Sequence, residues 1–392
     1  MSVSLSHEWQ LMVKPQSESN KGSKKRSLLW YVPAVFFQII GGLVVYYKLR
    51  KSDATTARNS LFVGIMLSVV TIVVVVFLYG SFQADMAVAQ SRIAKGSQII
   101  DTSFGPIEYA DVGHGYPVLV VHGAGGGYDQ GIILANILLD GNSYRVIAPS
   151  RFGYLHTPVP DTTNNKSSFA AQADAYANLL DKLNIKKVAV LGFSAGGPSS
   201  IEFVLRHPDK TSVLVLASAV VHKEPPMGPM DYVIHYGLFK SDFAFWLIAK
   251  YFQPSLLSFF GVNSEEQANI APAEKSWLSS ILIPSMFPIS QRQPGMVNDR
   301  SNFALINYPL EQISAPTLVI HAKDDTLVSP SHSLYAVQKI PNAKHIEFAT
   351  GGHLLMGHHQ EIKSEIGKFF AQRHAMETRA LLLSTFQRQI HL

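Results

Sequence analysis

A serine lies between glycines in "LGFSAGG" (191–197), directly after the run "KKVAVLG". This run is short, Val-rich and bounded by charge, which is typical of a strand buried in a parallel sheet, whereas "AGGPSSIEFVLRHP" has apolar residues at helical spacing. We therefore expect Ser194 at a sharp turn from strand to helix. Gly192 and Gly196 complete a G-x-S-x-G pattern, in which small residues permit a strained serine backbone and a close helix. The pattern predicts a nucleophilic serine, and for the pentapeptide alone a turn without chemistry remains the alternative.

A serine hydroxyl is a weak nucleophile and needs a base, an acid that orients the base, and donors for the oxyanion. Two later loops offer the base and the acid. Asp324 and Asp325 follow the strand-like "PTLVIHA", and His353 follows the strand-like "KHIEFAT". Both loops are expected at the carboxyl edge of a parallel sheet, where the serine is also expected.

From about Ile99 the sequence alternates strand-like and helix-like segments, which predicts a mainly parallel, doubly wound α/β sheet. In the helix before the serine, apolar residues recur every three or four positions and form a core-facing stripe. Between about Val220 and Gln312 the alternation stops, and prolines punctuate segments rich in aromatic residues. This segment predicts a helical insert, apolar enough to suggest a lipophilic substrate.

Five motifs, in this order, carry a resemblance to a known family: "HGAGGG" (122–127), "PSRFGY" (149–154), "GFSAGG" (192–197), "HAKDDTLVSP" (321–330) and "GGH" (351–353). From about Ile99 onward the sequence resembles the α/β-hydrolase superfamily with a lid. The resemblance implies a core at 99–219 and 313–375, a helical lid at 220–312 and a C-terminal tail at 376–392. Ala322, where glycine is usual, and Ser150, where aspartate is frequent, depart from the family pattern.

The resemblance also implies roles for individual residues. In the family's acid loop the aspartate stands four places after a histidine such as His321, which selects Asp325 and leaves Asp324 as the alternative. Ser194 would attack the carbonyl, His353 would take and return the proton, and Asp325 would orient His353. The backbone N–H of Ala195 would be one oxyanion donor and that of Ala124 the other.

Two uncharged stretches precede the hydrolase-like part, at 28–47 and 61–79. Each is close to the roughly 20 residues that cross a bilayer as a helix, so two transmembrane helices are predicted, after a basic tail (1–27) and before a linker (81–98). A hairpin would place on one side Lys14, Lys21, Lys24, Lys25, Arg26, Arg92 and Lys95, and on the other Lys48, Arg50, Lys51 and Arg58. This bias predicts a cytoplasmic hydrolase domain. If only the second stretch spans, the domain is exported, and "AVA" (87–89) resembles a cleavage site.

Several other functions are disfavoured. Much of the excess basic charge lies in the first hundred residues, which argues against nucleic-acid binding and for a membrane surface. The chain has no cysteine, which removes disulfides and thiolate nucleophiles. Tyr128 stands where a dinucleotide-binding G-x-G-x-x-G would need its last glycine, and His358 and His359 lie outside any H-E-x-x-H pattern. No cofactor and no metal are therefore predicted.

The sequence as a whole predicts a membrane-anchored serine hydrolase that cleaves a lipophilic carboxylic ester through an acyl-enzyme intermediate. Hydrolysis of a carbon–carbon bond, or another reaction on the same triad, is the first alternative. A non-catalytic membrane protein of the same fold is the second.

Overall fold

The structure is a computed structural model that describes residues 27–140, 143–160 and 167–373. Nearly all of the predicted basic tail (1–27) and the predicted C-terminal tail (376–392) lie outside these ranges. The chain divides into two compact units, 1–81 and 82–392. Each unit is described by itself.

The first unit is a pair of apolar helices. A short turn, η1 (Leu28–Tyr31), leads into α1 (Val32–Leu49), and α2 (Ala54–Ile93) begins after a tight loop. The helices approach closely at small residues, since a side-chain carbon on Gly64 would lie 2.4 Å from the Gln38 carbonyl oxygen. At Gln38 the backbone leaves the helical conformation, and its side-chain amide donates to Thr71 Oγ1 at 2.9 Å. The backbone N–H of the next residue, Ile39, donates to Ser68 Oγ at 3.2 Å, so the neighbouring helix supplies its acceptor.

By length and composition, both helices could cross a membrane. Most of their large apolar side chains are exposed. Helix α2 is much longer than the uncharged stretch at 61–79 on which the sequence prediction rested, and over 83–92 most of the added residues are Ala, Gln, Met or Arg, which are good helix formers. The helix continues through most of the predicted linker, as far as Ile93.

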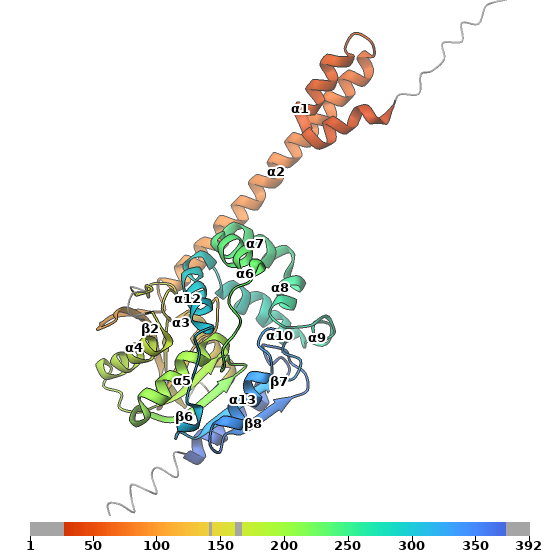
Figure 1. Cartoon of the computed structure of the whole chain (residues 1–392). Coiled ribbons are helices and arrows are strands. Elements are labelled where there is room, and N and C mark those ends of the chain that lie inside the picture. Colours follow the sequence, from red (N-terminus) through yellow and green to blue (C-terminus); the bar gives the residue numbers. More distant parts are fainter. Residues whose placement is uncertain (1–26, 141–142, 161–166, 374–392) are drawn as a thin grey trace, which may run out of the picture. The chain divides into compact units, whose positions relative to one another are not determined.

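The second unit is built on one eight-stranded sheet with the order β1-β2-β4-β3-β5-β6-β7-β8. Strands β2, β6, β7 and β8 of this sheet are labelled in Figure 1. The strands are β1 (Gln98–Thr102), β2 (Gly105–Gly113), β3 (Tyr116–Val121), β4 (Tyr144–Pro149), β5 (Val188–Phe193), β6 (Thr211–Ala217), β7 (Thr317–Ala322) and β8 (Lys344–Phe348). The pairs β1–β2 and β2–β4 are antiparallel, and all other pairs are parallel. The predicted mainly parallel, doubly wound sheet is confirmed.

Helices cover both faces of this sheet, as the alternation of strand side chains requires. Leu119 and Val121 of β3 pack in one core with α4 (Phe169–Lys182), α5 (Gly197–Arg206) and α13 (Ser331–Lys339). Val118 and Val120 pack in a second core with α3 (Tyr128–Leu138) and a final helix at 359–373. The central strands β5, β6 and β7 are buried along their whole length and are accordingly apolar on both faces.

A helical lid connects β6 to β7, as predicted. Its elements are α6 (Pro229–Tyr232), η5 (Val233–Gly237), η6 (Leu238–Lys240), α7 (Asp242–Tyr251), α8 (Gln253–Phe259), α9 (Ser264–Asn269), α10 (Pro272–Trp277), η7 (Leu278–Leu282), α11 (Ile283–Ser285), η8 (Ile289–Gln291), α12 (Gln293–Phe303) and η9 (Leu310–Gln312). Several of these helices begin with proline in their first turn, where its missing N–H costs nothing. The prolines divide the segment into short helices.

A buried carboxylate ties the lid to the sheet layer. Asp129 of α3 accepts hydrogen bonds from both terminal nitrogens of Arg292, at 3.0 and 2.8 Å, and also pairs with Arg92. Arg292 is fully buried, and Arg92 also donates to the lid carbonyls of residues 284, 285 and 287. Burial raises the pKa of Asp129, but the two guanidinium groups outweigh it and lower the pKa to about 2.

Asp129→Asn is expected to destabilise the second unit by about 2–3 kcal/mol at neutral pH, because it leaves the buried Arg292 charge uncompensated. The wild-type contribution is present above the unfolded pKa of about 4 and is lost as the pH falls toward the folded pKa of about 2. The difference between the two proteins should therefore close across this window. Chemical unfolding of the full-length protein in mild detergent at several pH values measures it.

Asp181→Asn is the matched control, since Asp181 is 60% exposed and pairs with Lys210 at the surface. It should leave stability nearly unchanged. Equal effects of the two substitutions at neutral pH would contradict the structural role given to Asp129.

Candidate active site

Ser194 lies at the turn from β5 to α5, in the short helical turn η3 (Ser194–Gly196). Its φ is +52°, in the left-handed region that side chains other than glycine rarely adopt. No side chain fits at the neighbouring glycines. A side-chain carbon on Gly196 would lie 2.4 Å from the Val121 carbonyl oxygen, and one on Gly192 would lie 2.5 Å from Ser200 Oγ. The G-x-S-x-G pattern thus allows the turn to press against strand β3 and helix α5.

The structure brings the three predicted catalytic residues together. His353 Nε2 lies 2.9 Å from Ser194 Oγ, and His353 Nδ1 lies 2.8 Å from Asp325 Oδ2. Ser194 follows β5, Asp325 follows β7 and His353 follows β8, so all three lie at the same edge of the sheet. Each is less than 7% exposed. The arrangement has the order nucleophile, base and acid that a serine hydrolase needs.

Asp325 is held by four donors. Its Oδ1 accepts from the backbone N–H groups of Leu327 and Val328, both at 2.9 Å, and its Oδ2 is also 3.0 Å from His321 Nε2. Burial raises the pKa of Asp325, but the His353 charge and these hydrogen bonds outweigh it and hold the pKa well below its usual range. The carboxylate therefore stays ionised at neutral pH, as an acid that orients a histidine must.

Asp324, the alternative acid, lies in a different environment. Its Oδ1 accepts from the Gly352 N–H at 2.9 Å, next to the histidine in sequence. This contact joins the acid loop to the histidine loop. Among the described residues, the carboxylate that accepts a hydrogen bond from the His353 ring is that of Asp325 and not that of Asp324.

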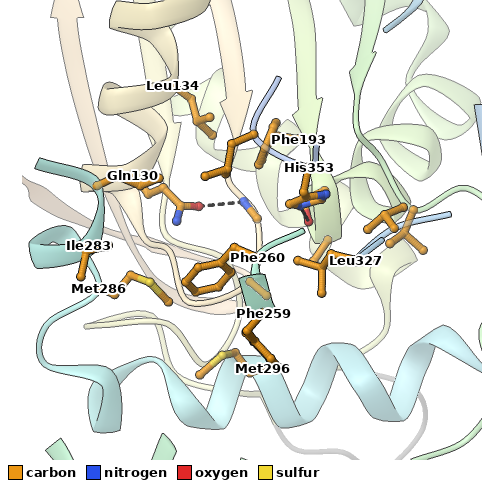
Figure 2. A pocket seen from close by; sticks show the side chains of 18 of the residues that line it. Gln130, Leu134, Phe193, Phe259, Phe260, Ile283, Met286, Met296, Leu327 and His353 are labelled. Carbon is orange, nitrogen blue, oxygen red and sulfur yellow. Dashed lines mark hydrogen bonds between the residues drawn. The ribbon is translucent and has the colours of Figure 1, made fainter. Parts of the chain in front are cut away.

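The Ser194 hydroxyl lies at a mainly apolar cavity of about 310 Å³. Figure 2 shows Phe259, Phe260, Ile283 and Met286 of the lid facing His353 and Phe193 of the sheet layer. Ala124 and Ala195, the predicted oxyanion donors, both line this cavity. The Ala124 N–H has no hydrogen-bond partner in the described part of the chain, so it is available to a ligand.

The polar lining was not found from the sequence. Gln130, Glu224, Asp231, His235 and Arg300 line the cavity together with the apolar side chains. Four of these five come from the lid segment, and no motif marks them. They meet only when the lid folds over the sheet, so sequence spacing holds no signal for them.

His358 and His359, which the sequence analysis weighed as metal ligands, each make a separate contact within the protein. The ring of His358 stacks on Phe348, and His359 Nε2 lies 2.8 Å from the Leu354 carbonyl oxygen. A different group, His222, Glu224 and His332, has potential ligand atoms within 4.8 Å of one another. However, His332 already uses Nδ1 to accept from the backbone and Nε2 to bond Glu224.

Comparison with known proteins places this geometry in a family. Residues 116–359 match the family model described as alpha/beta hydrolase fold, and the chain belongs to this family of hydrolases. It is 29% identical over 259 residues to the uncharacterised hydrolase YcgS of Bacillus subtilis, covering 64% of this chain and 89% of that one. It is 28% identical over 251 residues to 2-hydroxymuconate semialdehyde hydrolase of Pseudomonas putida, covering 64% and 85%. An α/β hydrolase fold protein of Nakamurella multipartita has a similar structure, with a TM-score of 0.58 and 29% identity, covering 70% of this chain and 98% of that one.

Asp325→Asn is expected to lower kcat for hydrolysis by about 10⁴-fold, because the amide cannot stabilise the protonated His353 and favours the wrong ring tautomer. Asp324→Asn, the matched control one residue away, should lower kcat less than about tenfold, since it alters only the contact to Gly352. Steady-state kinetics of the two variants with one substrate measures both. The reverse order of effects would move the acid to Asp324.

Proposed function

We propose that the protein hydrolyses a carbon–carbon bond next to the ketone carbonyl of a conjugated keto acid with an apolar acyl end, with Ser194 as nucleophile, His353 as general base and Asp325 as the group that orients His353. The observation that carries the proposal is the Ser194–His353–Asp325 arrangement opening into a mainly apolar cavity. The relative named for 2-hydroxymuconate semialdehyde supports the carbon–carbon reaction. This gives preference to the first sequence-based alternative over ester cleavage.

The chemistry follows from the positions of the groups. Ser194 Oγ adds to the carbonyl carbon and gives its proton to His353, while the Ala124 and Ala195 N–H groups hold the oxyanion. The carbon–carbon bond breaks with its electron pair moving into the conjugated keto acid, and His353 returns a proton to that fragment. Water then hydrolyses the acyl-serine, so that one ketone and one water give a carboxylic acid and a dienoate.

The cavity favours particular substrates within this class. Its lining of Phe, Met, Leu and Ile side chains favours a large apolar acyl group over a formyl group. Arg300 lines the same cavity and donates to Asp231 at 3.1 Å. The charge of its guanidinium group at the cavity favours a substrate that carries a carboxylate, such as a dienoate.

Ester cleavage is the second candidate function. Asp231 pairs with Arg300, and the carboxylate of Glu224 also lines the cavity, so its charged lining is not net positive and an uncharged lipophilic ester also fits. The triad chemistry is unchanged, with an alcohol as the leaving group in place of carbon.

The decisive assay compares 2-hydroxymuconate semialdehyde, its phenyl ketone analogue and neutral p-nitrophenyl esters of increasing chain length, with full-length protein in mild detergent. The phenyl ketone is expected to have the highest kcat/KM, and Ser194→Ala should lower turnover of every substrate by at least about 10³-fold. Arg300→Gln should raise KM for the two dienoates by about tenfold and leave KM of the esters within about twofold. Higher kcat/KM for the esters would instead make the protein an esterase, and full activity of Ser194→Ala would overturn the triad.

We also propose that α1 and α2 anchor the protein in a lipid bilayer, with the core (99–219 and 313–375) and lid (220–312) on the cytoplasmic side. The exposed apolar side chains of both helices support this, as does the pairing of Gln38 with Thr71, which satisfies a polar group without water. The basic residues flanking the helices support the cytoplasmic side, and an exported domain is the alternative. A bilayer would also concentrate lipophilic substrates.

Full-length protein is expected to stay in the membrane fraction after washing with high salt and with alkaline buffer, because inserted helices are held by apolar burial and not by charge. A shortened chain that begins at Phe82 keeps the contacts of Asp85 and Arg92 with the lid, and should be released and active on a short ester. Release of the full-length protein by salt would contradict the anchor. Protease digestion of sealed vesicles would distinguish the cytoplasmic from the exported arrangement.

A further inference from the structure

Both backbone polar groups of Gly123, the residue before Ala124, are held by hydrogen bonds. The Gly123 carbonyl oxygen lies 2.7 Å from His122 Nδ1 and accepts from Arg151 Nη2 at 3.2 Å. The Gly123 N–H donates to Gln130 Oε1 at 3.0 Å, a contact drawn in Figure 2. Gly126 must be glycine for these contacts to exist, because a side-chain carbon there would lie 2.5 Å from His122 Nδ1.

The hydrogen bonds define which His122 nitrogen carries the proton. The backbone N–H of Arg151 donates to His122 Nε2 at 3.0 Å, so Nε2 is the acceptor and Nδ1 carries the hydrogen. Nδ1–H can therefore donate to the Gly123 carbonyl. Burial and the Arg151 charge lower the pKa of His122 well below its usual value, which keeps the ring neutral and this tautomer in place.

Arg151 is in turn fixed by a buried network. Asp299 of α12 accepts from both terminal nitrogens of Arg151 at 2.6 Å and from the Tyr154 hydroxyl at 2.6 Å. All three side chains are at most 1% exposed. Asp299 lies 148 positions from Arg151 in the sequence, so the lid segment holds a guanidinium that contacts the loop beside Ser194.

We propose that His122 and Arg151 are positioning residues that keep the Ala124 N–H directed at the oxyanion. The Gly123–Ala124 peptide is trans, and across a trans peptide the C=O and the next N–H point in opposite directions. Because the carbonyl is bound to His122 and Arg151, the Ala124 N–H faces away from them, toward the cavity that Ala124 and Ser194 line.

Without these two donors, the glycine at 123 would let the peptide rotate, since glycine has little conformational preference. A rotated peptide would present a carbonyl oxygen to the oxyanion and repel it. The inference rests on the proposed function, because it concerns the oxyanion of the Ser194 reaction.

The test compares His122→Ala with His122→Asn in the full-length protein. Asn places an amide N–H near the position of Nδ1 and can still donate to the Gly123 carbonyl, whereas Ala cannot. We expect His122→Ala to lower kcat by about 10- to 100-fold with KM within about threefold, and His122→Asn to recover at least about tenfold of that loss. The rate of Ser194 labelling by a fluorophosphonate should fall in parallel. His207→Ala, which removes a surface histidine paired with Asp174, is the control and should change neither rate.

The outcomes separate the two proposals. Wild-type protein that is not labelled at Ser194 overturns the proposed function. If Ser194 is labelled as fast in His122→Ala as in wild type, the positioning role alone is overturned. Equal losses of kcat in His122→Ala and His122→Asn also overturn it, because they would show that His122 acts through packing and not through its N–H. Should His122→Ala fail to fold, Arg151→Lys is the second test. Lysine keeps a positive charge opposite Asp299, but it lacks the planar guanidinium group that bonds Asp299 and the Gly123 carbonyl at the same time. A kcat in this variant within twofold of wild type would overturn the proposal.

Discussion

The left-handed backbone of Ser194 is the constraint on which the rest of the site depends. A non-glycine residue in this region costs about 1–3 kcal/mol, and it persists only where the surroundings fix it. Here they do so from two sides, because the Ser194 carbonyl accepts from Val220 N–H at 3.0 Å and Gly196 lies against the carbonyl oxygens of Val121 and His122. The strain is therefore balanced by the packed core around β3, β5 and α5. In return, the serine hydroxyl is presented at the sheet edge, within hydrogen-bonding distance of His353.

The parts of the site that follow from local chemistry could be predicted from the sequence. Ser194 is marked by its glycines, and His353 and the acid loop follow strand-like segments, so a parallel sheet must bring them to one edge. The choice between Asp324 and Asp325 was harder, because adjacent residues point in different directions and spacing cannot tell which faces the histidine. The family resemblance selected Asp325, and the contacts of His321 and His353 with its carboxylate agree with that choice.

The parts that depend on long-range packing could not be predicted. The ion pair of Arg151 with Asp299 and that of Asp129 with Arg292 each join residues more than 140 positions apart. Nothing in the sequence near either partner indicates the other, and a single arginine in a loop is normally a surface residue. The same limit applies to Arg300 in the cavity. The full length of α2 could not be predicted from the uncharged stretch alone, because the helix continues through polar residues on both sides of that stretch.

Both buried pairs join the lid segment to the layer that holds the active site. Arg292 and Asp299 belong to the last part of the lid, and their partners Asp129 and Arg151 belong to loops and helices next to β3 and β4. A buried ion pair adds little net stability over apolar packing, but removing one partner is costly, so such pairs permit very few alternative arrangements. The base of the lid is thereby fixed in one position, while its middle part contacts the cavity mainly through apolar side chains, whose packing is not directional. Under the proposed function, catalysis depends on the fixed part, where a small displacement of the oxyanion donors would slow the reaction, and substrate choice depends on the apolar part.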